Sequence, residues 1–169
     1  MDAIDAIMSR RSIRSYTEET VSKGDSETLL EAAMAAPSAG NEQPWHFVVV
    51  QDREVLEAIP RYHQYADMLR EAPLAVVICG DLDEEKHEGF WVQDCSAAVQ
   101  NLLVAAHALG LGAVWLGVHP EPRRVEGTRE LLGLPQQVVP LAIVSVGHPA
   151  EEKPPAERYC SERVHWDRW

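Results

Sequence analysis

The segment from about Gly89 to Leu109 constrains the fold of this chain more than any other. Its apolar residues recur on most sides of a helix rather than along one stripe. They are Trp91, Val92, Cys95, Ala98, Leu102, Leu103, Ala105 and Ala106. A helix that is apolar nearly all round has to be covered on several sides. We therefore expect this helix to be a central one.

The rest of the chain alternates between short apolar runs and helical patterns. The runs predict strands at 46–51, 74–79, 113–118 and 138–146, and helical spacing predicts helices at 2–10, between Ser22 and Pro37, and at 53–59, 64–70 and 122–132. A length of 169 residues suits a single domain that spans residues 1–169. From Gly147 onward the proline-rich sequence predicts an irregular tail over 147–169.

The charge balance excludes several classes of partner. The chain has 15 Lys and Arg against 27 Asp and Glu, a net charge of −12. Nucleic-acid binding depends largely on cations that neutralise phosphates, and anionic membranes repel an acidic protein. No apolar run approaches the roughly 18 residues of a membrane span, and the start of the chain lacks the basic residues of a signal peptide. We expect a soluble, cytoplasmic protein that binds neither nucleic acid nor membrane.

The residue types of protein-based catalysis are scattered. The three cysteines fit neither a disulfide framework nor a zinc clip, and Cys79 and Cys95 are predicted to be buried apolar residues. The histidines occur singly, so neither a metal site nor a catalytic dyad is indicated. If the protein is an enzyme, a cofactor should therefore supply the chemistry.

Basic residues gather at two places in this acidic chain. Arg10, Arg11 and Arg14 lie within five positions, with Ser12 among them. Arginine binds phosphate in a bidentate manner, and a serine hydroxyl adds a donor. The second concentration consists of Lys153, Arg158, Arg163 and Arg168. Both groups could bind one phosphate, or the arginines could pair with the abundant surface carboxylates.

Two further segments have the composition of ligand-binding loops. Residues 37–45 combine small residues with the amides of Asn41 and Gln43, which could bind the edge of a flat ring, or could simply end a helix and form a turn. Glycines interrupt the strand within 110–118 and could free backbone N–H groups for a ligand. The same glycines also fit a helix C-cap followed by a bulge.

Taken in order along the chain, these segments resemble the FMN-dependent nitroreductase family, as a small member with a short lid. The resemblance covers essentially the whole chain. It is carried by Arg10 to Tyr16, by Ala36 to Phe47 with its Pro-Ser-Ala-Gly-Asn-Glu-Gln-Pro-Trp sequence, by Asn101 to Gly117, and by Val146 to Pro149 before Lys153.

The resemblance implies an α+β fold with three α/β/α layers around a mixed, largely antiparallel sheet. It also implies an intertwined homodimer that holds an FMN at each of two interface sites. Helix 89–109 would form much of the dimer core, which agrees with its apolar circumference. The tail 147–169 would extend over the partner and bury Trp166 and Trp169.

The same resemblance implies a role for individual residues at the FMN. Arg10, Arg11 and Ser12 would hold the phosphate and ribityl chain, and Lys153 and Arg158 would also lie at the phosphate.

The flavin ring would have its own set of residues. Arg14 and Gln64 would lie at its pyrimidine end, and Gly117, or Leu116, would direct a backbone N–H toward N5. The other subunit would cover the ring with Pro37, Ser38, Ala39 and Asn41.

The implied activity is a ping-pong reaction. NAD(P)H, as NADH or NADPH, would deliver a hydride to flavin N5 and leave, and an acceptor such as a nitroaromatic compound or a quinone would then be reduced. Other FMN chemistry in the family, namely reductive dehalogenation, enoate reduction or flavin breakdown, is an alternative, and so is a non-enzymatic flavin-binding protein. Only residues 80–89 are available for a lid, and Trp91 or Tyr65 could contact the substrate.

Overall fold

The computed structural model describes residues 1–169 and contains one four-stranded sheet. Its strands are β1 (Trp45–Val50), β2 (Leu74–Asp81), β3 (Gly112–Gly117) and β4 (Val138–Gly147). They lie in the order β1-β2-β4-β3, and every neighbouring pair is antiparallel. A parallel bridge joins Ser12 to Ala113 at the outer edge of β3. The predicted mixed, largely antiparallel sheet is confirmed.

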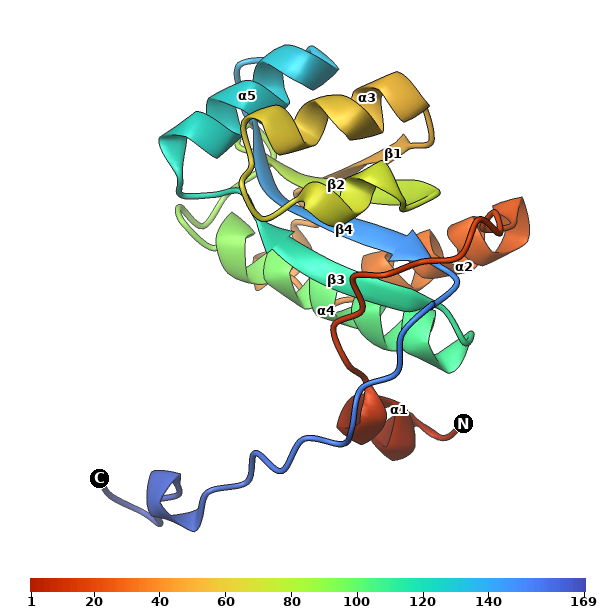
Figure 1. The fold of residues 1–169 in the computed structure, drawn as a ribbon. Helices are drawn as coiled ribbons and strands as arrows, with labels where there is room; N and C mark the ends of the chain where they lie inside the picture. Colours follow the sequence, from red (N-terminus) through yellow and green to blue (C-terminus); the bar gives the residue numbers. More distant parts are fainter.

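Helices cover both faces of this sheet, which confirms the three α/β/α layers (Figure 1). One face carries α2 (Lys23–Met34) and α4 (Trp91–Ala108), and the other carries α3 (Arg53–Ala58) and α5 (Pro122–Leu132). Helix α1 (Ala3–Ser9) lies below the sheet in this view, near the end of α4. None of the helices has the length and apolarity to span a membrane.

The two faces of β2 explain its unbroken apolar sequence. Side chains of successive residues in a strand point to opposite faces. Leu74, Val76 and Ile78 therefore pack in the core beneath α4, while Val77 and Cys79 pack in the core beneath α3. A strand that is covered on both faces needs no polar alternation.

The predicted boundaries agree with the observed ones within a few residues, with one exception. The helix predicted at 64–70 is wrong, because this segment contains only a 3₁₀ turn at Asp67–Arg70. Ala66, Leu69 and Ala72 are the fully buried residues here. Their spacing of three residues matches the three residues per turn of a 3₁₀ helix rather than an α-helix.

The interior confirms the prediction for two cysteines. Cys79 and Cys95 are both fully buried, and burial raises the pKa of each thiol to about 12. Both thiols are therefore protonated at neutral pH and act as small apolar residues.

Helix α4 is covered on only one side within this chain. Eight of its residues are buried, including Trp91, Cys95 and Leu102. On the opposite side an apolar groove of about 590 Å³ runs between α4, α1 and α2, and it is lined by Ile7, Ala32, Ala35, Gln100, Asn101, Val104 and Ala105. We expected α4 to be covered on several sides, but the single chain leaves the side at this groove open.

Candidate functional site

Segments from both ends of the chain lie side by side at the edge of β3 (Figure 1). The amide of Ile13 donates to the carbonyl of Ala113 on β3, at 3.0 Å. The amide of Thr17 donates to the carbonyl of His148, and that of Ala150 donates to the carbonyl of Ser15, each at 2.9 Å. These bonds place residues 12–17 between β3 and the segment that follows β4.

The side chain of Tyr16 fixes the N-terminal segment against β4. Its buried hydroxyl lies 2.7 Å from the carbonyl of Ile13, to which it donates, and 2.6 Å from Oγ of Ser145. Its ring packs where a side chain on Gly147 would stand, since a Cβ there would lie 2.8 Å from Cδ1 of Tyr16. Likewise, a Cβ on Gly112 would lie 2.7 Å from Cγ2 of Ile13. These two glycines are needed for the close approach of the segments.

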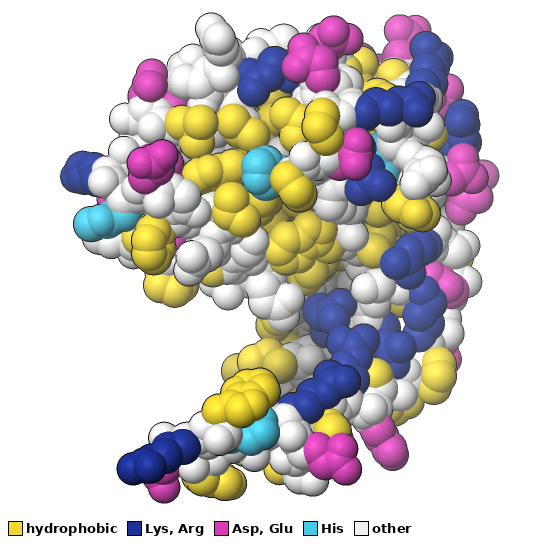
Figure 2. All heavy atoms as spheres, turned by 90° about the vertical axis from the view of Figure 1, so that its left-hand side faces the viewer, with side chains coloured by type: hydrophobic (Ala, Val, Ile, Leu, Met, Phe, Trp, Pro, Cys, Tyr) yellow, Lys and Arg dark blue, Asp and Glu magenta, His cyan; other side chains and the backbone are white.

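This crossing brings the two predicted groups of cations together. Burial lowers the pKa of Arg10, and the neighbouring positive charges of Arg158 and Arg11 lower it further. Arg11 donates to the carbonyl of Pro154, and Nζ of Lys153 donates to the carbonyl of Ser12 at 2.5 Å. Figure 2 shows the resulting band of Lys and Arg along the hollow between the body and the tail.

The arginines of this band lack carboxylate partners. None of the guanidinium groups of Arg10, Arg11, Arg14 and Arg158 has a carboxylate oxygen within 4.0 Å. The carboxylate of Glu151 pairs with Lys153 at 3.1 Å and accepts a hydrogen bond from the backbone amide of Arg14 at 2.5 Å. The alternative that these arginines pair with surface carboxylates is therefore contradicted. Arg163 and Arg168 lie farther out in the exposed tail. In a chain of net charge −12, unpaired arginines held together have the chemistry to bind an anion.

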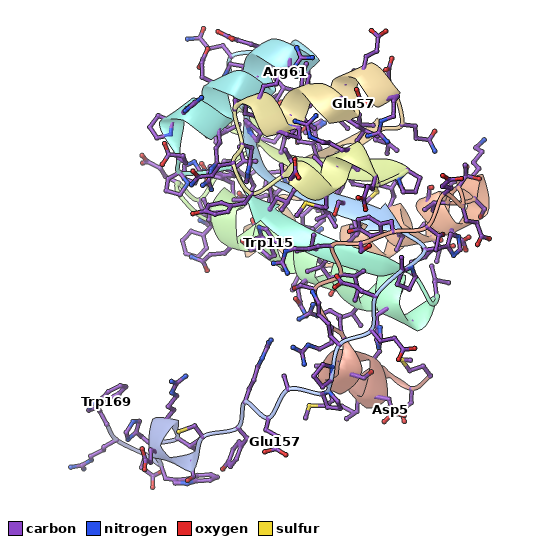
Figure 3. All side chains as sticks on the ribbon, in the orientation of Figure 1. Asp5, Glu57, Arg61, Trp115, Glu157 and Trp169 are labelled. Atoms are coloured by element: carbon purple, nitrogen blue, oxygen red, sulfur yellow. The ribbon has the colours of Figure 1, made fainter.

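A cavity of about 380 Å³ opens near these arginines, at the edge of β3. It is lined by Arg14, His63, Tyr65, Met68, Trp115, Leu116, Gly117 and Arg124. Figure 3 shows Trp115 on β3, on the side that faces the tail. Arg14 lines the cavity and follows Arg10 and Arg11 closely in the chain, so residues 10–14 connect the basic group to the cavity. Of the two residues suggested for substrate contact, Tyr65 lines the cavity, whereas Trp91 is buried against Gly80.

The hydrogen-bond pattern of β3 leaves backbone groups available at this cavity. In an antiparallel ladder, alternate residues bond to the neighbouring strand. The amide of Val118 donates to the carbonyl of Leu141, so the backbone groups of the even-numbered residues of β3 face β4. The amide of Ile13 donates to the carbonyl of Ala113, so the backbone groups of the odd-numbered residues face away from β4. The amide of Gly117 therefore points outward into the open edge, whereas the amide of Leu116 belongs to the sheet.

Two residues that the sequence did not single out orient Gly117. Its carbonyl accepts hydrogen bonds from Nε2 of His63 at 2.9 Å and from Arg124 at 3.0 Å. Burial lowers the pKa of His63, so its ring is neutral at pH 7, with the proton on Nε2. The guanidinium group of Arg124 lies 5.3 Å from the centre of the Tyr65 ring. A single histidine and a helical arginine far apart in sequence give no signal of this contact.

Gln64 lies beside the cavity rather than in it. It lines a smaller neighbouring cavity of about 220 Å³, which shares Arg124 with the first.

The loop 37–43 lies apart from the arginines of its own chain. None of Pro37, Ser38, Ala39 and Asn41 lines the cavities described above. Two hydrogen bonds within the loop stabilise it: the amide of Gln43 donates to Oγ of Ser38, and the side chain of Gln43 donates to Asn41, each at 3.0 Å. A third bond joins the loop to α4, because the amide of Ala39 donates to Asp94 at 3.0 Å. Asn41 and Gln43 have φ of 57° and 53°, a left-handed conformation that is uncommon outside glycine.

The fold is that of an α+β protein with a cavity at the edge of its sheet and unpaired arginines near it. A family model described as the nitroreductase family matches residues 7–64 and 60–148. The chain therefore belongs to the nitroreductase family, as its sequence motifs suggested.

Individual relatives are similar over nearly their whole length. A Methanothermobacter thermautotrophicus protein described as "Putative NADH dehydrogenase/NAD(P)H nitroreductase" is 48% identical over 169 residues, which is 100% of this chain and 88% of that protein. A crystal structure with the same description, from Parabacteroides distasonis, has a TM-score of 0.96 and 40% identity and covers 99% of this chain and 98% of its own. A structure described as "FMN-dependent Nitroreductase", from Clostridium difficile, has a TM-score of 0.91 and 31% identity, and the match covers 98% of this chain and 99% of that one.

We predict that the Tyr16 anchor makes stability fall at alkaline pH. Burial raises the pKa of Tyr16 to about 12, from 10.0. The stabilisation that Tyr16 contributes to the folded state is complete below pH 10. It falls as the pH rises from 10 to 12, because in this range the tyrosine ionises only in the unfolded chain, and it is lost above that range. Tyr16→Phe should cost about 1–2 kcal/mol at pH 8. Urea unfolding of both proteins should show this difference shrinking above pH 10, and a constant difference would contradict the assignment.

Proposed function

We propose that this protein is an FMN-dependent oxidoreductase, with one FMN-binding domain per chain, which passes electrons from NAD(P)H to an organic acceptor such as a nitroaromatic compound or a quinone. The observation that carries the proposal is the cavity at the edge of β3, which is lined by Arg14 and Gly117 and lies next to the segment that carries Arg10 and Arg11. The names of two relatives, an NAD(P)H nitroreductase and an FMN-dependent nitroreductase, support it.

The basic group fits the phosphate of FMN. A phosphate monoester is a dianion near neutral pH, and Arg10, Arg11 and Arg158 lie together without a counter-charge. The hydroxyl of Ser12 makes no hydrogen bond within the chain and adds a donor. Lys153 already contacts the Ser12 carbonyl and Glu151, so its role is to hold Ser12 in place and to add positive charge.

The cavity fits the flavin ring. The outward amide of Gly117 can donate to N5, and a Cβ built on Gly117 would meet nothing within 4 Å, so the space beside it is open. Because the amide of Leu116 is used by the sheet, we assign this donor to Gly117, with Leu116 as part of the cavity wall. Arg14 lines this cavity, and Gln64 lines the adjoining one.

When bound, FMN would supply the redox chemistry, which is hydride transfer from the reduced nicotinamide to the acceptor, and the acceptor would also take a proton from solvent. Arg14 provides positive charge where negative charge develops on reduction, which favours electron uptake. His63 and Arg124 fix the Gly117 peptide, so its N–H is oriented beforehand. One open cavity serves both partners, and this supports a ping-pong order in which reductant leaves before acceptor binds.

A second copy of the chain would complete the site. The groove on α4 is apolar, and Ile4, Ile7, Met8 and Met34 are exposed around α1 and α2. Trp166 and Trp169 are 85% and 101% exposed at the end of the projecting tail, which Figure 3 shows far from the body. Large exposed apolar surfaces indicate an interface. We propose a homodimer in which the tail covers the partner.

In this dimer the loop 37–43 reaches the site of the other subunit. Pro37, Ser38, Ala39 and Asn41 are absent from the cavities of their own chain, which agrees with a role at the partner's flavin.

The proposed function is tested by the absorption spectrum. Protein incubated with FMN and freed of excess should be yellow, should bleach on anaerobic addition of NADH or NADPH, and should regain its colour when a quinone or a nitroaromatic compound is added. Protein that stays colourless would refute the proposal. Bound FMN that neither nicotinamide reduces would favour a non-enzymatic flavin-binding protein or one of the other FMN chemistries.

The phosphate assignment predicts a difference between two flavins. Arg10→Ala should weaken FMN binding by about 10- to 100-fold, because a charge-assisted contact to the phosphate is lost. Riboflavin, which has no phosphate, should bind the variant and the wild type equally. Flavin fluorescence titration measures both. Arg61→Ala, an exposed arginine outside the site, is the matched control. An equal loss of affinity for both flavins would contradict the assignment.

The dimer predicts a mass of about twice 18.8 kDa for the native protein. Val104→Glu places a charge in the apolar groove and should shift the mass toward a single chain and weaken FMN binding. Val49→Glu, at an exposed valine on β1, should leave the mass unchanged. Sedimentation velocity measures both, and a wild-type protein with the mass of one chain would overturn the dimer.

A further inference from the structure

A second cavity borders the one at the edge of β3. It has a volume of about 220 Å³ and is lined by Tyr62, Gln64, Glu121, Arg123 and Arg124. Arg124 lines both cavities, so the second cavity adjoins the one that fits the flavin ring. The second cavity lies at the start of α5, on the opposite side of Gly117 from the basic group at residues 10–12.

The two arginines of this cavity have no charged partner. Neither Arg123 nor Arg124 has a carboxylate oxygen within 4.0 Å. Arg124 uses NH1 to bind the carbonyl of Gly117, and its other guanidinium nitrogens have no acceptor in the protein. Arg123 makes no side-chain hydrogen bond and is exposed. Both side chains therefore keep donors that a ligand can use.

Helix stability does not explain these arginines. The first turn of α5 contains no acidic residue, and cations there oppose the helix dipole. Two arginines against the single carboxylate of Glu121 leave the lining with one net positive charge. Neighbouring like charges repel, and an anion held between them removes that repulsion. The second cavity thus has the chemistry of an anion subsite that adjoins the ring cavity.

We propose that Arg123 and Arg124 bind the pyrophosphate of the nicotinamide dinucleotide that reduces the enzyme. This inference rests on the proposed function. In a dinucleotide one ribose separates the nicotinamide ring from the pyrophosphate, whereas the 2′-phosphate of NADPH lies on the adenosine ribose beyond it. A subsite that adjoins the ring cavity therefore fits the pyrophosphate. Quinone and nitroaromatic acceptors carry no phosphate, so this contact is specific for the reductant.

The test compares three reductants on the FMN-loaded protein. Arg123→Gln should raise the apparent Kd of NADH and of NADPH by the same factor, about 3- to 10-fold for an exposed charge-assisted contact, with the limiting rate of flavin bleaching unchanged. The apparent Kd of 1-benzyl-1,4-dihydronicotinamide, which has no phosphate, should not change. Stopped-flow measurement of flavin bleaching under anaerobic conditions gives the apparent Kd and the limiting rate for each reductant.

Two further variants sharpen this test. Glu121→Gln removes the only negative charge of the lining and should lower the Kd of both dinucleotides. Arg61→Gln makes the same charge change as Arg123→Gln at an exposed position outside both cavities and should leave every constant unchanged. Added salt should reduce the effect of Arg123→Gln, because the contact is electrostatic.

Several outcomes would overturn the assignment. Equal Kd values for Arg123→Gln and wild type would remove Arg123 from the subsite. An effect confined to NADPH would point to the 2′-phosphate, and an equal effect on the phosphate-free reductant would point to a general disturbance of the ring cavity. If the wild-type protein is bleached by none of the reductants, the proposed function itself fails, which is distinguishable from all three.

Discussion

The crossing of residues 12–17 with the segment after β4 is the constraint on which the site depends. Arginines that lie more than 140 positions apart are brought together although they repel one another, and their charges add to the burial that lowers the pKa of Arg10. Backbone hydrogen bonds to Ala113, His148 and Ser15, together with the buried hydroxyl of Tyr16, hold them there. Buried hydrogen bonds of this kind can outweigh the repulsion between partly solvated cations.

The position of β3 at the edge of the sheet is the second condition. An edge strand leaves every other backbone N–H and C=O without a partner strand. Residues 12 and 13 cover one part of this edge, while the part at Gly117 remains open and borders the cavity. The Gly117 carbonyl is held by His63 and Arg124. The same edge therefore serves both as an attachment for the N-terminal segment and as a donor for a ligand.

Local patterns were sufficient to predict most elements and the family. The helix predicted between Ser22 and Pro37 is α2, which Ser22 caps through the amide of Asp25, and the short apolar runs at 74–79 and 138–146 form the two central strands. The clustering of Arg10, Arg11 and Arg14 is also visible in the sequence alone. The segment 64–70 was not predictable, because apolar residues three apart in a short stretch fit a 3₁₀ turn and one face of an α-helix alike.

The sequence by itself determined where positive charge, small residues and apolar faces occur, since these depend only on residue type and spacing. Only the tertiary structure decided which charges remain unpaired, which amide of β3 points outward, and that His63, Arg124 and Arg123 gather around one end of that strand. Pairing, strand order and burial depend on contacts between distant segments, and no local pattern encodes them. The open side of α4 shows the same limit, because an apolar helix face predicts that it will be covered but not by what.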